Sequence, residues 1–147
     1  MLTMKGKYGL KAVLHLARQP EGALALSADI AAANTISKKF LDAILHELRI
    51  AGLVAARKGR GGGYRLARPA ERITVGEVLR VLDGPVAPIQ CASRSAYQPC
   101  HDCPDEAVCA VRLTMIEVRD AIAAVLDSRS IAEVAARTVP EAARATA

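Results

Sequence analysis

The chain has 147 residues and carries a formal charge of +5 at pH 7, with 20 Lys and Arg against 15 Asp and Glu. This length allows one domain with its own core, or a small domain with an appendage, but excludes two large domains. Trp is absent, Phe40 is the only phenylalanine, and alanine, leucine and valine dominate the apolar residues, so we expect a mainly α-helical fold.

No apolar stretch approaches the ~20 residues that span a bilayer, and the N-terminus lacks the apolar core of a signal peptide. We therefore expect a cytoplasmic protein without a membrane partner. Two helices are predicted before residue 36. The first spans residues 5–18 and is ended by Pro20 and Gly22, and the second is short, capped by Ser27 and followed by a polar break at residues 34–35.

The stretch from Ile36 to Leu66 is the most informative part of the sequence. After Ser37, a good N-cap, apolar residues recur at spacings of three and four until Gly52, which predicts a helix from about Ser37 to Ala51. A basic amphipathic helix that follows a shorter helix across a tight turn is typical of the recognition helix in a helix-turn-helix. Its open face carries Lys38, Lys39, Asp42, His46 and Arg49.

A glycine-rich loop follows this helix between two short apolar-rich runs, residues 53–57 and 64–68. Residues 59–63 include four glycines, which permit positive φ, and Lys58 and Arg60 place two cations at the tip. The pattern predicts a β-hairpin wing that contacts DNA phosphates or a narrow minor groove. It does not indicate a nucleotide-binding loop, because the motif G-x-x-x-x-G-K-[ST] is absent and no helix is predicted to follow.

The charge is unevenly distributed along the chain. Residues 1–68 hold 12 Lys or Arg and four acids, for a net charge of +8, whereas residues 69–147 hold eight Arg and 11 acids, for a net charge of −3. A solvated basic face is the simple alternative, but helix and wing together favour a polyanion partner, double-stranded DNA. We expect the C-terminal half to make no contact with it.

Three further helices are predicted downstream of the wing. Thr74 to Glu77 matches a capping box that opens a helix ended at residues 83–85. Pro104 and the two acids after it predict the start of a long helix, and Ser130 begins a short last one. Along the long helix, apolar residues recur at alternating spacings of three and four. This pattern predicts a coiled-coil seam and hence a homodimer, with an ordinary core-facing helix as the alternative. The seam residues are Val108, Val111, Met115, Val118, Ile122 and Val125.

All four cysteines, Cys91, Cys100, Cys103 and Cys109, fall within 19 residues. In a cytoplasmic protein this clustering indicates metal binding or redox sensing rather than a structural disulfide. Thiolates select zinc, copper(I) or iron–sulfur clusters. Only one C-x2-C pair is present and the spacing is irregular, which favours an iron–sulfur cluster and leaves zinc as the alternative. We expect Cys103 to lie at a helix N-terminus, where the helix dipole favours the thiolate.

Catalytic patterns are missing from the sequence. A lone C-x-x-C without a thioredoxin-like βαβ pattern is weak evidence for a redox enzyme. No Ser/His/Asp set and no pair of carboxylates is predicted to converge, and His15 and His46 lie on helix faces as packing or DNA-facing residues. We therefore expect a protein that is not an enzyme.

The segments SKKFLDAILHELRIAGLVAARKGRGGGYRLARP and ITVGEVLRVLDGP, with the cysteine loop after them, carry a resemblance. They resemble the bacterial winged-helix regulators typified by IscR, NsrR and CymR, and the resemblance extends from Leu2 to about Thr138. It implies a homodimer that binds pseudo-palindromic operators and pairs through the long helix. In the cysteine-bearing branch it also implies a 2Fe-2S or 4Fe-4S cluster that responds to iron, redox state or nitric oxide and controls DNA binding.

The resemblance also assigns roles to residues. It implies that Ser37, Lys39 and Asp42 face bases and that Lys58 enters the minor groove. Cys103-x5-Cys109 matches the last two cysteines of IscR-like proteins, with Cys91 or Cys100 as the first ligand. However, Arg112 stands where a ligating histidine is expected, and no acid lies near Lys7-Tyr8, so an all-cysteine site within one subunit is predicted. The full set of expected DNA-binding residues is Ser37, Lys38, Lys39, Asp42, Lys58, Arg60, Gly61 and Tyr64.

These observations predict a mainly α fold with a small β-hairpin, made of a winged helix-turn-helix domain and a long dimerisation helix. We expect four parts along the chain: the DNA-binding domain at residues 1–84, a cysteine-rich loop at 85–103, dimerisation helices at 104–138 and a flexible tail at 139–147.

Overall fold

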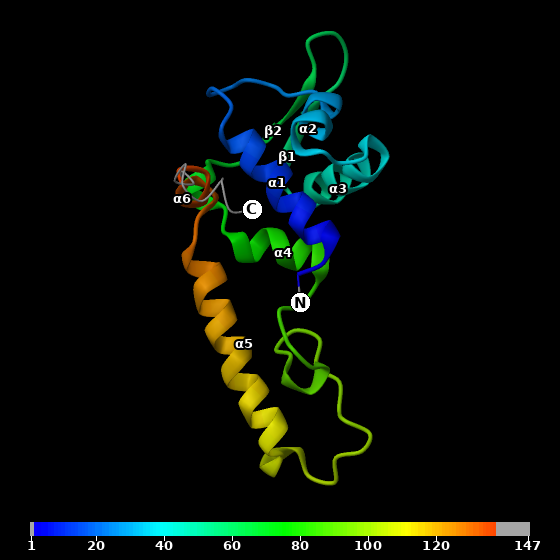
Figure 1. The fold of residues 1–147 in the computed structure, drawn as a ribbon, viewed down its shortest axis with the longest axis vertical. Helices are drawn as coiled ribbons and strands as arrows, with labels where there is room; N and C mark the ends of the chain where they lie inside the picture. Colours follow the sequence, from blue (N-terminus) through cyan, green and yellow to red (C-terminus); the bar gives the residue numbers. More distant parts are fainter. Residues whose placement is uncertain (1, 138–147) are drawn as a thin grey trace, which may run out of the picture.

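The computed structural model describes residues 2–137 as a set of helices with one two-stranded hairpin (Figure 1). The predicted fold class, mainly α with a small β-hairpin, is confirmed. The expected tail at 139–147 lies outside the described residues. The helices are α1 (Met4–Ala17), α2 (Ser27–Asn34), α3 (Lys38–Ile50), α4 (Val75–Asp83), α5 (Ala110–Ser128) and α6 (Ile131–Ala135), and the strands are β1 (Val54–Arg57) and β2 (Gly63–Leu66). Short 3-10 turns occur at η1 (Ala70–Arg72), η2 (Gln90–Ala92) and η3 (Glu106–Val108).

Helix α1 lies at the centre of the winged module and packs on α2, α3, α4 and α6. Gly9 of α1 allows a close approach to α4, because a Cβ at this position would collide with the side chain of Leu82. The core is aliphatic, as the composition predicts. Its largest fully buried side chains are Val13, Ile30, Leu41, Ile44, Leu45, Leu48, Val54, Ile73, Val78 and Ile131.

The turn between α2 and α3 fixes the direction of α3. Thr35 has φ 55°, the only positive φ of a non-glycine residue among residues 2–137, and the N–H of Ile36 donates to the carbonyl of Ala31 at 2.9 Å. Ser27 is the first residue of α2, and Leu26 occupies the capping position predicted for Ser27. The two helices and this turn form the helix-turn-helix expected from the sequence.

The hairpin follows α3 directly, and β1 pairs with β2 in an antiparallel register from Val54 opposite Leu66 to Arg57 opposite Gly63. Ala25, just before α2, adds an isolated bridge to Tyr64, with N–O distances of 2.9 and 2.8 Å. Gly63 has φ 149°, and a Cβ there would come within 2.7 Å of the carbonyl oxygen of Ala25. This glycine therefore permits the base of the wing to join the helix-turn-helix.

The predicted capping box before α4 is present: the Thr74 side chain accepts from the N–H of Glu77, and the Glu77 carboxylate accepts from the N–H of Thr74. The predicted start of the long helix at Pro104 is wrong. A single 3-10 turn, η3, follows Asp105, and the backbone then becomes extended at Cys109 (φ −70°, ψ 109°), so α5 begins at Ala110.

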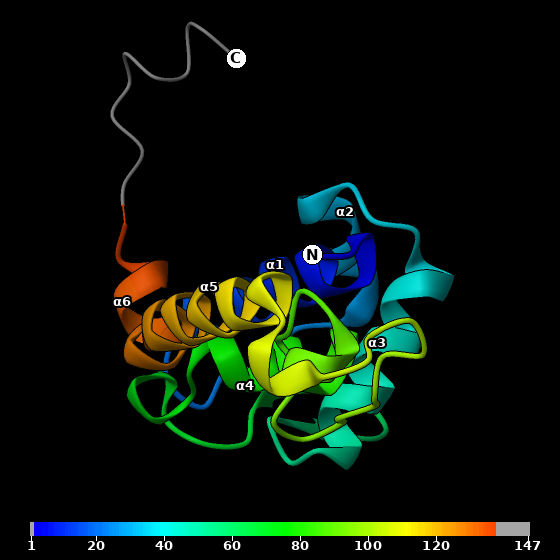
Figure 2. The ribbon, with the colours of Figure 1, turned by 90° about the horizontal axis from the view of Figure 1, so that it is seen from below.

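Helix α5 leaves the winged module and runs beside the cysteine loop, so that the hairpin and this loop lie at opposite ends of the molecule (Figure 1). Seen from below, α5 and the loop lie in front of the winged module (Figure 2). No residue of α5 is buried. Within residues 2–137, no helix combines the length and apolar character needed to cross a membrane.

Candidate functional site

The exposed face of α3 presents the side chains that the sequence assigns to DNA recognition. Ser37 occupies the N-cap position, but its side chain makes no capping hydrogen bond, so its hydroxyl is not engaged by the helix. Lys38 and Lys39, in the first turn, are exposed. The opposite face of α3 is anchored in the core by Leu41, Ile44, Leu45 and Leu48. This burial holds the cationic first turn rigidly outward.

Asp42 is paired within the protein. The Lys38 Nζ donates to its carboxylate at 2.8 Å, and this hydrogen bond holds the pKa of Asp42 below its ordinary value, with a smaller contribution from the Ser27 hydroxyl. Lys39, by contrast, makes no ion pair within residues 2–137.

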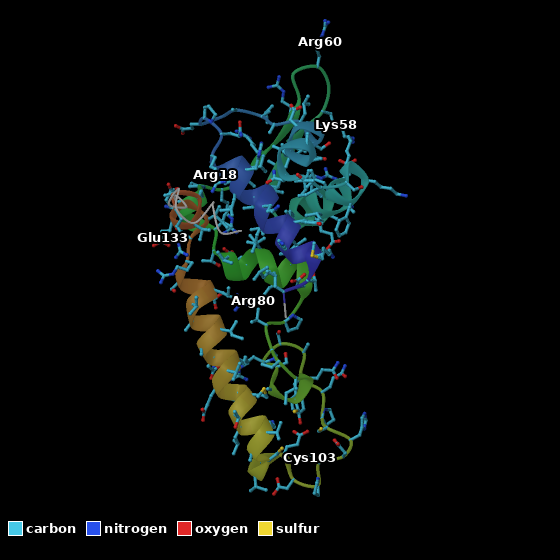
Figure 3. All side chains as sticks on the ribbon, viewed as in Figure 1. Arg18, Lys58, Arg60, Arg80, Cys103 and Glu133 are labelled. Carbon is cyan, nitrogen blue, oxygen red and sulfur yellow. The ribbon has the colours of Figure 1, made fainter. Side chains whose placement is uncertain are left out.

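The hairpin tip presents two further cations. Lys58, Arg60 and Gly61 are exposed, and Arg60 extends outward from the tip (Figure 3). Tyr64 differs from the other predicted DNA-binding residues, because its half-buried side chain packs against the core and its backbone pairs with Ala25. The structure thus places Tyr64 at the base of the wing.

The four cysteines line one pocket of about 240 Å³ at the far end of the molecule, beside the start of α5. Cys91 is buried in η2, Cys103 and Cys109 are half-buried, and Cys100 is exposed. Ile89, Asp102, Glu106, Val111 and Arg112 complete the lining. Within residues 2–137, no three side chains of His, Cys, Asp or Glu are drawn together closely enough to hold a metal ion.

Residues outside the cysteine motif hold this loop in place. The Nε of Arg112 donates to the carbonyl of Cys91 at 2.8 Å, and Arg119 donates to the carbonyl of Ala92, so α5 anchors η2. The Glu106 carboxylate accepts from the N–H of Cys100 at 2.7 Å and from the hydroxyl of Tyr97. Sequence reasoning missed Glu106 and Arg119, because nothing local marks contacts that span up to 27 residues.

The thiols differ in their electrostatic surroundings. Cys109, not Cys103, occupies the N-cap of α5, and the Arg112 backbone N–H, together with the Cys103 thiol, lowers the pKa of Cys109. Partial burial and the neighbouring Cys109 raise the pKa of Cys103. The expected dipole effect on Cys103 is therefore wrong, since the helix starts six residues later than predicted. A hydrogen bond to Asp102 raises the pKa of Cys100 to about 11.

A family profile described as Rrf2, iron-dependent transcriptional regulator, matches residues 2–137. The chain belongs to the Rrf2 family. It is 43% identical over 146 residues to an rrf2-like protein of Rhodobacter capsulatus, an alignment that covers 97% of each sequence. It is also 36% identical over 138 residues to the transcriptional regulator CymR of Bacillus subtilis, covering 93% of this chain and 91% of CymR.

Solved structures of Rrf2 proteins share the fold. The structure of B. subtilis CymR, described as that organism's global cysteine regulator, aligns with a TM-score of 0.78 and 32% identity over 95% of this chain and 98% of CymR. The structure of T. potens IscR aligns with a TM-score of 0.72 and 28% identity, over 91% and 85% of the two chains. This Rrf2-family chain is thus a winged-helix transcriptional regulator that binds DNA, and its relatives are named as regulators rather than enzymes.

Proposed function

We propose that the protein is a homodimer that binds a pseudo-palindromic operator, and that an iron–sulfur cluster held by Cys91, Cys100, Cys103 and Cys109 controls this binding. The observation that carries the proposal is that all four thiols line one pocket, in the segment that connects α4 of the winged module to α5.

In this proposal α3 enters the major groove with Ser37, Lys38, Lys39 and Asp42 facing base edges and phosphates. Lys58, Arg60 and the backbone near Gly61 contact the phosphates or the minor groove beside it. Since Asp42 is already paired with Lys38, Lys39 is the cation best placed to read a base directly. Two-fold symmetry would place the two half-sites about one helical turn, roughly 34 Å, apart.

The exposed apolar face of α5 supports the homodimer. Val118, Ile122 and Val125 are 38%, 40% and 58% exposed in the protomer, and they repeat at the spacing of a coiled-coil seam. A contiguous apolar stripe of this kind marks an interaction surface. Ile122→Asp should convert the dimer to a monomer in sedimentation, whereas Glu117→Arg, a charge change on the same helix, should not. A dimer that survives Ile122→Asp would place the subunit contact elsewhere.

The pocket suits an iron–sulfur cluster in chemistry and size. Four thiol side chains supply the soft donors that such clusters require. The pocket volume of about 240 Å³ equals the liquid volume of roughly eight water molecules, which is more than one metal ion needs. Bound there, a cluster would supply a centre sensitive to iron, redox state or nitric oxide. Its anionic thiolates would face the guanidinium of Arg112, and the N-terminus of α5 would stabilise the Cys109 thiolate.

The link to DNA binding lies in how the loop is attached. Arg112 and Arg119 tie η2 to α5, while the chain on the other side of η2 runs directly into α4. Drawing the four thiols together would therefore move the loop against both helices and change the angle between the winged module and α5. A bound cluster can shift the equilibrium between these two arrangements of the winged module and α5 only by the difference in its affinity for them.

A second candidate is a zinc site or a thiol-based redox switch built from the same cysteines. The close approach of Cys103 and Cys109, whose sulfurs influence each other's pKa, favours it. Anaerobic purification separates the candidates. The proposal predicts a brown protein with visible absorption and bound iron and sulfide. A colourless protein with stoichiometric zinc, or one without metal that forms an intramolecular disulfide, would overturn the cluster and leave DNA binding intact.

A further inference from the structure

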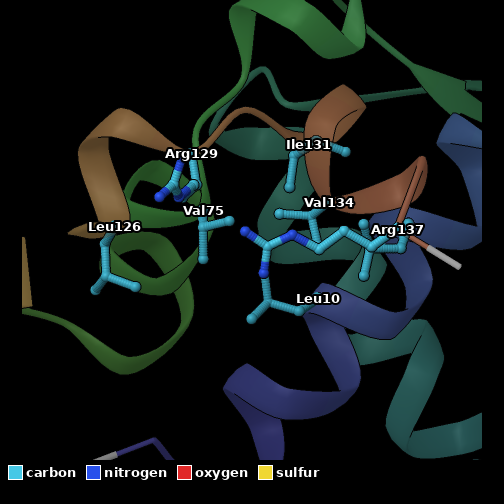
Figure 4. Close-up of a pocket in the computed structure, with 8 residues that line it drawn as sticks. Leu10, Val75, Leu126, Arg129, Ile131, Val134 and Arg137 are labelled. Carbon is cyan, nitrogen blue, oxygen red and sulfur yellow. The ribbon is translucent and has the colours of Figure 1, made fainter. Parts of the chain in front are cut away.

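A second pocket, of about 210 Å³, lies far from the cysteines, where α1 and α4 meet the end of α5 and the start of α6 (Figure 4). Its wall is apolar, with at least one aliphatic side chain from each of these four helices. Leu10, Val75, Leu126 and Val134 form this wall. The pocket is not part of the DNA-binding face or of the cysteine site.

Two arginines complete the lining of this pocket beside the apolar wall. Arg129 lies in the connection between α5 and α6, and Arg137 lies just after α6. Figure 4 shows the guanidinium of Arg137 extending across the pocket toward Leu10 and Val75. Neither arginine makes an ion pair within residues 2–137.

The acid in this neighbourhood is already engaged. Glu133 sits in the charge field of both arginines, but its carboxylate accepts hydrogen bonds from the N–H and the hydroxyl of Ser130, at 2.8 and 3.1 Å, in the capping box of α6. Within residues 2–137, the pocket therefore combines an aliphatic wall with two guanidinium groups that make no ion pair. A guanidinium binds a carboxylate through charge-assisted, often paired hydrogen bonds.

We propose that this pocket binds a small monocarboxylate with a short aliphatic chain, the carboxylate on Arg129 and Arg137 and the chain against Leu10, Val75 and Val134. The volume corresponds to roughly seven water molecules, which limits the ligand to a similar number of non-hydrogen atoms. One side of the site is fixed, because the N–H of Val75 donates to the carbonyl of Arg129 at 3.0 Å and the N–H of Ile131 donates to that of Ile73 at 2.8 Å. A bound ligand would thus touch the winged module and the α5–α6 segment together.

The test measures calorimetric binding of three probes to the full-length protein: hexanoate, the neutral isostere hexan-1-ol, and acetate. We expect hexanoate to bind with a stoichiometry of one per protomer and the other two to bind much more weakly. The double variant Arg129→Gln/Arg137→Gln should raise the dissociation constant for hexanoate by roughly ten- to a hundred-fold, the range expected on losing hydrogen bonds to a charged group. The matched control Arg49→Gln/Arg65→Gln, which removes two exposed arginines elsewhere, should leave it unchanged.

Other outcomes overturn the proposal. Equal binding of hexan-1-ol would show that the arginines contribute nothing, and equal binding of acetate would show a nonspecific anion effect. Binding of hexanoate by a chain that ends at Arg137, but not by the full chain, would show that residues 138–147 and not a small carboxylate occupy the site. None of these results depends on the cysteine pocket or on operator binding, so the two proposals fail separately.

Discussion

Arg80 and Asp127 form a bidentate ion pair, with N–O distances of 2.6 and 2.9 Å, that joins α4 to the last turn of α5. The pairing lowers the pKa of Asp127 and raises that of Arg80. It depends on Gly76, because a Cβ there would collide with the Asp127 carboxylate. Arg80, Asp127 and Gly76 thus help to fix the position of α5 against the winged module. In the proposed function, the cysteine loop would act on DNA binding by changing this position.

Gly76→Ala should therefore break this ion pair as Asp127→Asn does, but destabilise the protein no more than Asp127→Asn. The ion pair is about half exposed, so its loss should cost only ~0.5 kcal/mol of the free energy of unfolding. The added methyl group meets only the flexible ends of the Asp127 and Arg80 side chains, so it should displace them and break the ion pair without moving α5, and the higher helix propensity of alanine in α4 should offset part of the cost. Urea unfolding of the reduced, metal-free protein measures both values. A cost of ~1–3 kcal/mol for Gly76→Ala, the range of overpacking, would show instead that the methyl group forces α5 away from α4.

The capping box of α4 should give the protein a measurable acid sensitivity. The backbone N–H of Thr74, assisted by Arg68, lowers the pKa of Glu77 from its ordinary 4.5. Because the folded pKa lies below the unfolded one, the stabilisation is complete above about pH 4.5 and is lost as the pH falls through the folded value. Glu77→Gln should lose less free energy of unfolding between pH 7 and about pH 3 than the wild type does. Glu71→Gln, which removes an exposed carboxylate, serves as the control and should behave as wild type.

The wing should contribute to DNA affinity without selecting sequence. Lys58→Ala/Arg60→Ala should weaken binding to every duplex and reduce the slope of log affinity against log salt by about 1.8, the value for two phosphate contacts. Arg94→Ala, on the cysteine loop, changes charge without touching the wing and should leave the slope unchanged. Lys39→Ala should instead change which operators are preferred. A silent wing double variant would rule out the docking described above.

In the reduced, metal-free protein, the cysteines should not react in the order of their solvent exposure. Cys109, whose pKa is lowered, should react fastest with iodoacetamide near neutral pH, because the thiolate is the nucleophile. Cys100 should react slowly although it is exposed, since its pKa is raised to about 11. Asp102→Asn should accelerate Cys100, and mass spectrometry of the labelled peptides measures both rates. If Cys100 is labelled first, the hydrogen bond to Asp102 does not persist in solution.

Much of the fold follows from short-range signals in the sequence. Thr74 and Glu77 form the predicted capping box, and Gly52 adopts the positive φ expected after α3. The glycines of the wing permit its turn and its contact with Ala25. The capping box depends on residues only three positions apart. The glycines occupy backbone conformations that other residues rarely adopt. The sequence alone therefore predicts these features.

The cysteine site was less predictable, because tertiary contacts determine it. The acids after Pro104 suggest a helix start, but Glu106 instead binds the N–H of Cys100 and the Tyr97 hydroxyl. That contact favours a single 3-10 turn and moves the helix start to Ala110, which makes Cys109 the thiol at the helix N-terminus. Ser37 likewise occupies the predicted N-cap without using its side chain there.

The most direct test of the central claim is the operator affinity of cluster-loaded and metal-free protein, measured anaerobically at one fixed salt concentration on a duplex selected from a random pool by the protein itself. If the cysteine pocket controls the winged module, the two affinities should differ by about 5- to 150-fold, the usual range for coupled sites. Equal affinities, with the cluster shown to be present by its visible absorption, would contradict control by the cluster.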